Sequence, residues 1–83
     1  MNKIDVNEQV IVTALGFKKN MVVYPRRMEF RGVTYNFIDA GLRCLSKFGN
    51  YVAEFVTVSD GKLDYHLRID NRESGWTLLS ITS

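Results

Sequence analysis

The sequence has 83 residues, of which 46% are hydrophobic and 24% charged, and its formal net charge is +2. That length suits one compact domain over residues 1–83 and is too short for a Rossmann domain, a kinase or a (β/α)₈ barrel. The hydrophobic and charged fractions are typical of a globular protein. The single cysteine, Cys44, excludes an intramolecular disulfide and a metal site built on several thiolates.

Neither a secretory signal nor a membrane span is expected from the apolar runs. The first eight residues, MNKIDVNE, contain no apolar segment of the length that a signal peptide needs. Apolar runs elsewhere extend over only a few residues, far below the ~20 that cross a bilayer. We therefore expect a cytoplasmic protein with no membrane partner.

The first half of the chain is rich in β-branched and aromatic residues interrupted by turn residues, which is typical of short strands. A proline cannot donate to a strand ladder, so Pro25 predicts a strand edge or a bulge. Gly32, after Arg31, suits the tight turn of a hairpin. We expect strands over residues 10–13, 21–24, 28–30 and 33–37.

Residues 39–49 allow two interpretations. In the first they form a short helix with Asp39 as the N-cap and Gly49 just past the end. In the second the strand continues to about Cys44, with Gly41 at a bulge and residues 47–50 as the turn. We favour the strand, because a glycine in the first helical turn costs about 1 kcal/mol.

The second half carries the clearest hairpin signal. Residues 51–58 and 63–69 flank Asp60-Gly61, a dipeptide in which both residues tolerate positive φ. The second of these runs alternates strictly between apolar and polar residues, which predicts one buried and one exposed face. A last strand is expected over residues 76–81.

These elements predict an all-β domain, an antiparallel meander of five to six strands. Because several strands have large apolar residues on both faces, we expect a half-open SH3-like barrel or curled sheet, or a second face buried in a dimer. The predicted core consists of Val10, Val12, Val22, Phe30, Tyr35, Phe37, Phe55, Leu63, Tyr65, Leu67, Ile69, Trp76, Leu78 and Ile81.

No motif for catalysis, metal binding or phosphate binding is present. The single histidine, His66, lies on the expected polar face next to Asp64, where a surface histidine is the simpler interpretation. Cys44 would need His66 nearby, in a concave pocket, to act as a nucleophile. The six glycines are isolated and there is no metal-ligand spacing. We expect no catalytic residue, no metal, no cofactor and no small-molecule substrate.

Charge is distributed unevenly along the chain. Residues 18–47 contain seven basic and two acidic side chains, a balance of +5, whereas residues 48–83 have a balance of −2. Basic residues near aromatic ones are suited to single-stranded nucleic acid, through phosphate contacts and base stacking. The candidate contact residues for nucleic acid or another partner are Lys18, Lys19, Tyr24, Arg26, Arg27, Arg31 and Arg43.

The chain resembles a group of small uncharacterised bacterial all-β domains, some encoded beside mutagenic DNA-repair polymerase genes. The resemblance covers about two thirds of the chain. It lies in Pro25, the Met28-Glu29-Phe30-Arg31-Gly32 segment, Tyr35, Asp60-Gly61, Tyr65-His66-Leu67 and Trp76-Thr77-Leu78. The group has no assigned activity, so the resemblance implies a small β fold but no functional residue.

We therefore expect a non-catalytic binding module whose partner is another protein or a second copy of itself. Exposed strand edges and apolar residues on both sheet faces suit such a role. Nucleic-acid binding through residues 17–47 is the alternative hypothesis.

Overall fold

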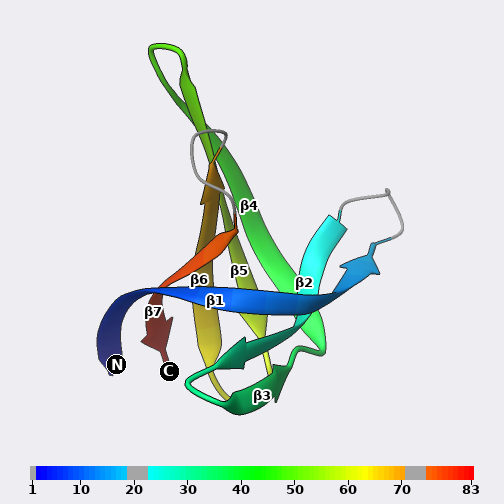
Figure 1. Ribbon diagram of the computed structural model, residues 1–83. Helices are drawn as coiled ribbons and strands as arrows, with labels where there is room; N and C mark the ends of the chain where they lie inside the picture. Colours follow the sequence, from blue (N-terminus) through cyan, green and yellow to red (C-terminus); the bar gives the residue numbers. More distant parts are fainter. Residues whose placement is uncertain (1, 19–22, 71–74) are drawn as a thin grey trace.

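The computed structural model describes residues 2–18, 23–70 and 75–83. Within them the chain forms one antiparallel sheet that curls through 234° into a half-barrel (Figure 1), which confirms the predicted fold class. Among the described residues no helix is long or apolar enough to cross a membrane. This part of the chain has seven strands, more than the five to six predicted: β1 (Lys3–Phe17), β2 (Val23–Phe30), β3 (Val33–Asn36), β4 (Asp39–Phe48), β5 (Tyr51–Ser59), β6 (Asp64–Asp70) and β7 (Trp76–Thr82).

The order of the strands in the sheet is β3-β2-β1-β7-β6-β5-β4, so the first and last strands pair in the middle and the two edges are β3 and β4. The chain passes from one edge to the other within two residues. The Phe37 N–H donates to the carbonyl of Arg26 over 2.8 Å, and the Ile38 N–H donates to the carbonyl of Ser59 over 2.8 Å. This corner holds the two edges together at one end of the half-barrel.

β1 is long because it pairs with two partners in succession. Its first half, from Lys3 to Val10, lies beside β7, and its second half, from Ile11 to Phe17, lies beside β2. The register shifts between Asp5 and Glu8 and again between Val12 and Leu15. Such shifts bend and twist a strand, which lets β1 follow the curvature of the half-barrel.

The predicted bulges are confirmed. Residues 39–48 form the strand β4, and its register with β5 shifts between Ala40 and Arg43, around Gly41. The prediction that one strand continues from Val33 to about Cys44 was wrong, because β3 ends at Asn36 and β4 lies at the other edge of the sheet and continues to Phe48. The turn that follows is at residues 49–50. Pro25 lies inside β2, opposite Leu15, where the β1–β2 register shifts.

The two predicted hairpins form, with different turns. At Arg31 and Gly32 φ is 52° and 76°, so both residues of the β2–β3 turn are left-handed, as a two-residue hairpin of type I′ requires. In the β5–β6 loop only Gly61 has positive φ, at 98°, so the expectation for Asp60 was wrong. Asp60 instead accepts hydrogen bonds from the N–H groups of Lys62 and Leu63, both over 2.9 Å.

The core fills the half-barrel at the end where the β3–β4 corner lies. Each fully buried side chain of the size of valine, leucine or phenylalanine contributes about 1.5–3 kcal/mol to the free energy of folding. Tyr65 is central to it, with its ring 5.0 Å from that of Phe37 and 5.7 Å from that of Tyr35. The buried core cluster consists of Val10, Met28, Phe30, Phe37, Ala40, Val56, Val58, Tyr65, Leu67 and Leu78.

The predicted core is confirmed in part. Phe55 was placed on the wrong face: Val56 lies opposite Leu67 and is buried, so its neighbour Phe55, opposite Arg68, points to the other side of the sheet. Met28, which is fully buried, was missing from the prediction. Val22 lies outside the described residues. The remaining predicted positions, only partly buried, are Val12, Tyr35, Leu63, Ile69, Trp76 and Ile81.

Candidate binding surface

Lys18 holds the end of β1 against the start of β4. Its Nζ donates to the carbonyl oxygen of Ala40 and lies 3.3 Å from Asp39 Oδ1. The hydrogen bond from Lys18 lowers the pKa of the Asp39 carboxyl. The positive charge of Lys18 is therefore partly neutralised within the molecule.

Arg27 on β2 and Arg31 in the β2–β3 turn also have partners. The Arg27 Nε donates to Thr13 Oγ1 over 3.0 Å. Arg31 forms an ion pair with Glu8, and its guanidinium carbon lies 4.9 Å from the centre of the Phe30 ring.

Arg43 on β4 pairs with Glu54 on β5. Arg26 is exposed, and no side-chain partner for it is found in the part of the chain that the structure describes. Tyr24 is half-buried with its ring over Gly16. Lys19 lies outside the described residues. The described basic residues thus lie at the end of β1, on β2, in the β2–β3 turn and on β4. Lys18, Arg31 and Arg43 pair with carboxylates.

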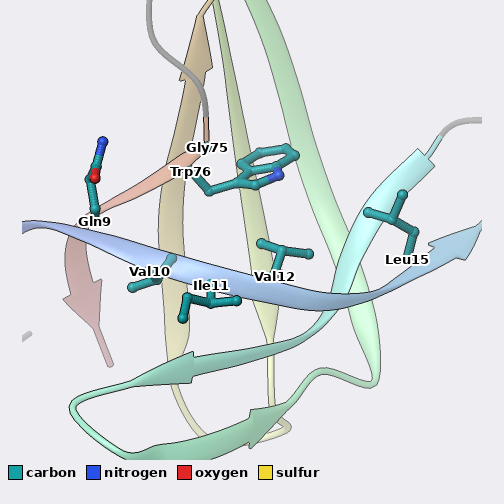
Figure 2. A pocket seen from close by; sticks show the side chains of 7 residues that line it. All are labelled: Gln9, Val10, Ile11, Val12, Leu15, Gly75 and Trp76. Atoms are coloured by element: carbon teal, nitrogen blue, oxygen red, sulfur yellow. The ribbon is translucent and has the colours of Figure 1, made fainter.

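A hollow opens in the half-barrel at the end opposite the β3–β4 corner, and Trp76 lies in its wall. Figure 2 shows the Trp76 indole, from the start of β7, and the side chains of Val12 and Leu15, from β1, around this space. This part of the hollow has a volume of about 450 Å³.

The hollow continues toward β4. An adjoining space of about 390 Å³ shares Leu15 and Trp76 and is also lined by Val23, Ile69 and the Arg43–Glu54 pair. A smaller space of about 200 Å³ extends it along β4 and β5. We name this surface the Trp76 hollow and define it by its apolar residues Val12, Leu15, Val23, Leu45, Val52, Ile69 and Trp76.

Local register explains how these side chains converge. Val10 and Val12 are two residues apart on one face of β1, and simple alternation would turn Leu15 away from them. The register shifts between Val12 and Leu15 return Leu15 to the same space. From the sequence, Val12, Ile69 and Trp76 were assigned to the core. Alternation shows which side chains face the inside of a curled sheet, but not at which positions that inside is filled by other side chains and at which it stays open.

The Trp76 hollow offers apolar contact and little reactive chemistry. Its charged residues are Arg43, Glu54 and Asp70. Arg43 and Glu54 form an ion pair with 39% and 23% of their side chains exposed, and Asp70 Oδ2 lies 3.8 Å from Arg68 Nε. The two residues considered for catalysis are separated, because β5 lies between Cys44 on β4 and His66 on β6. The ring nitrogens of His66 each lie 2.9 Å from a threonine hydroxyl, those of Thr57 and Thr82.

No group of three or more His, Cys, Asp or Glu side chains that could hold a metal ion is found among the described residues. Comparison of the chain with protein-family models, with curated proteins and with solved structures gives no match. Function is therefore inferred from the geometry of this surface.

Proposed function

We propose that this protein is a non-catalytic protein-binding module that holds an extended segment of a partner along the Trp76 hollow and the outer edge of β4. One observation carries the proposal: an apolar hollow runs directly up to β4, whose outer edge has no strand beside it within residues 2–18, 23–70 and 75–83. An added strand forms backbone hydrogen bonds to such an edge, and its alternate side chains enter the adjoining pockets.

The exposure of apolar side chains supports this role. Leu15 is 51% exposed, Leu45 65% and Val23 38%, although all three line the same surface. Burying a side chain of this size is worth about 1.5–3 kcal/mol, so a partner that covers several of them gains a substantial free energy of binding. An extended peptide with apolar residues at every second position fits this arrangement.

Nucleic-acid binding receives less support from the geometry. Lys18, Arg31 and Arg43 each pair with a carboxylate of this chain, and a phosphate would have to compete with that carboxylate. Nucleic-acid binding is therefore one of the outcomes that the experiment below distinguishes.

The experiment is selection of displayed random peptides on the immobilised protein, followed by binding measurements with the selected peptides. We expect peptides with alternating apolar residues, and we expect Leu15→Asp to weaken their binding at least about tenfold, which is about 1.4 kcal/mol. Ile4→Asp is the matched control, because Ile4 is also on β1 and 60% exposed but lies outside the Trp76 hollow.

Equal binding to both variants would overturn the proposal. So would failure to select peptides together with a low-salt mobility shift of single-stranded or duplex oligonucleotides that is lost in the Arg26→Ala/Arg27→Ala double variant. Low salt is the condition in which phosphate contacts are strongest.

A further inference from the structure

The two edges of the sheet differ in how well they are protected. β3 is only four residues long, and very short edge strands resist pairing with other chains. The first part of β4 is protected in another way, by the register shift after Ala40 and by Lys18 on the Ala40 carbonyl. Bulges and lysine side chains are both common means of blocking an edge.

The second part of β4, Arg43–Phe48, has neither the register shift nor the contact with Lys18, and its own lysine, Lys47, lies on the same face as Leu45. All six of its residues pair with β5 in an unbroken register, from Arg43 opposite Val56 to Phe48 opposite Tyr51. A regular strand of this kind is the form that accepts another strand. We name Arg43–Phe48 the open edge.

The open edge has an exposed apolar residue on each face. Leu45 is 65% exposed and Phe48 is 57% exposed. They lie on opposite faces, because their spacing in the strand is an odd number of residues. A strand that covers both needs apolar atoms on both of its own faces. The open edge offers Leu45 and the aliphatic stem of Lys47 on one face, and Cys44 and Phe48 on the other.

We propose that the open edge pairs with the open edge of a second copy of this chain, antiparallel, around a two-fold axis at Ser46. This inference rests on the proposed function, since it names the partner that β4 receives. A symmetric contact of this kind uses the same surface on both copies, so it closes at two chains and does not extend into a fibre.

Charge disfavours two other registers, even though Glu54 offsets part of the charge of Arg43. An axis at Leu45 would place Arg43 of each copy directly opposite Lys47 of the other. An axis at Arg43 would place the two copies of Arg43 directly opposite each other. Like charges in directly opposite positions of an antiparallel pair are destabilising.

An axis at Cys44 would pair only residues 43–45 of the open edge, because further pairs would reach the register shift between Ala40 and Arg43. An axis at Ser46 pairs residues 44–48, all of which lie in the open edge. It places Leu45 opposite Lys47, whose aliphatic stem can cover it, and Cys44 opposite Phe48. Of the four registers compared, the axis at Ser46 pairs the most regular backbone without placing like charges directly opposite each other.

The hairpin formed by β4 and β5 has space for a second copy. Its tip projects well beyond the other strands at the open end of the half-barrel (Figure 1). The Phe48 and Tyr51 rings lie 5.4 Å apart near this tip. Pairing there would continue the sheet across the two copies and bring additional apolar surface up to the Trp76 hollow of each.

The first experiment is sedimentation equilibrium of the full chain up to about 200 μM, a concentration at which a dimer of micromolar affinity is formed almost completely. We expect a dimer, and we expect Leu45→Lys to weaken it at least about tenfold, because a lysine at position 45 would lie opposite Lys47. Val33→Lys is the matched control, since Val33 is 51% exposed on the other edge strand, β3.

The second experiment tests the register by cross-linking with diamide, which oxidises two thiols to a disulfide and is itself reduced. Directly opposite residues in an antiparallel pair are about 4.5–5.5 Å apart between Cα atoms, within the range of a disulfide. The Cys44→Ser/Ser46→Cys variant should therefore form a covalent dimer rapidly. The unaltered chain should not, because its Cys44 would lie opposite Phe48.

A chain that remains monomeric at about 200 μM, or a dimer that Leu45→Lys leaves unchanged, would overturn the self-pairing. Rapid cross-linking of Cys44 in the unaltered chain, with slow cross-linking at position 46, would overturn the axis at Ser46. A monomer that still binds selected peptides, with the loss caused by Leu15→Asp, would leave the proposed function standing, so the two failures are distinguishable.

Discussion

The Tyr65 hydroxyl donates a hydrogen bond to Asp60 Oδ2 over 2.8 Å, which connects the most central aromatic residue of the core to the β5–β6 loop. The other oxygen of the same carboxylate accepts the N–H groups of Lys62 and Leu63. Burial of Tyr65 and its contact with Asp60 raise the pKa of the tyrosine hydroxyl. One carboxylate thus holds the loop closed and satisfies a buried hydroxyl.

Tyr65→Phe should destabilise the protein by about 1–2 kcal/mol, because it removes the donor to a charged acceptor while leaving the ring in place. Urea unfolding measures the change. Tyr35→Phe is the control, since the Tyr35 ring also packs in this aromatic group but its hydroxyl has no hydrogen bond among the described residues. An equal loss in both variants would contradict the role of Asp60.

Acid should remove the contribution of Asp60 to stability. The N–H groups of Leu63 and Lys62, in that order, lower the pKa of its carboxyl, so the folded state favours the ionised form. The contribution is present above the unfolded pKa of about 3.9 and is lost as pH falls through the lower folded pKa. Urea midpoints should show Asp60→Asn less stable than the unaltered chain at neutral pH, with the difference shrinking below about pH 4. A difference independent of pH would contradict this account.

Gly16→Ala should destabilise the protein by about 1–3 kcal/mol through overpacking. A Cβ at this position would lie 2.6 Å from Cζ of Tyr24, closer than real Cβ contacts. The Tyr24 ring packs against the core, so moving it disturbs other contacts. Thermal unfolding tests this, and in the Tyr24→Ala background the same glycine substitution should cost much less. Equal costs in the two backgrounds would show that the Tyr24 ring is not the obstacle.

Met28→Ala should cost about 2–5 kcal/mol, as buried methionines typically do. Met28 is 0% exposed and lies in the centre of β2, opposite Val12 and Tyr35. Val33→Ala on the adjacent strand is the control and should change the free energy of unfolding by less than about 0.5 kcal/mol, because Val33 is half exposed. A small loss for Met28→Ala would mean that the core tolerates the cavity.

The sequence predicts strands well where alternation and turn residues agree. The runs on either side of Asp60-Gly61 and of Arg31-Gly32 became hairpins, because turn chemistry is a local property. The preference for a strand up to about Cys44 rested on Gly41, and a bulge is found there, but the strand ends at Phe48. Phe55 was misassigned because Phe55 and Val56 are adjacent apolar residues, and only the register with β6 shows which of them faces inward.

The candidate surface was largely out of reach from the sequence. The basic residues of the middle segment were grouped by their proximity in the chain, but Glu8 and Glu54, which pair with Arg31 and Arg43, come from other parts of it. The Trp76 hollow depends on how far the sheet curls, and no local pattern encodes this. Leu15 joins it only through register shifts in β1.

The pairing of β1 with β7 has a consequence for how the protein reaches its fold. The contact between Ile4 and Ile81 joins residues 77 positions apart, and these two strands form the middle of the sheet. Folding rates fall as the sequence separation of contacts rises, so we expect folding in milliseconds to seconds. A nascent chain that lacks residues 76–82 would leave β1 and β6 each without one neighbour. Completion of the sheet therefore waits for the last strand to be synthesised.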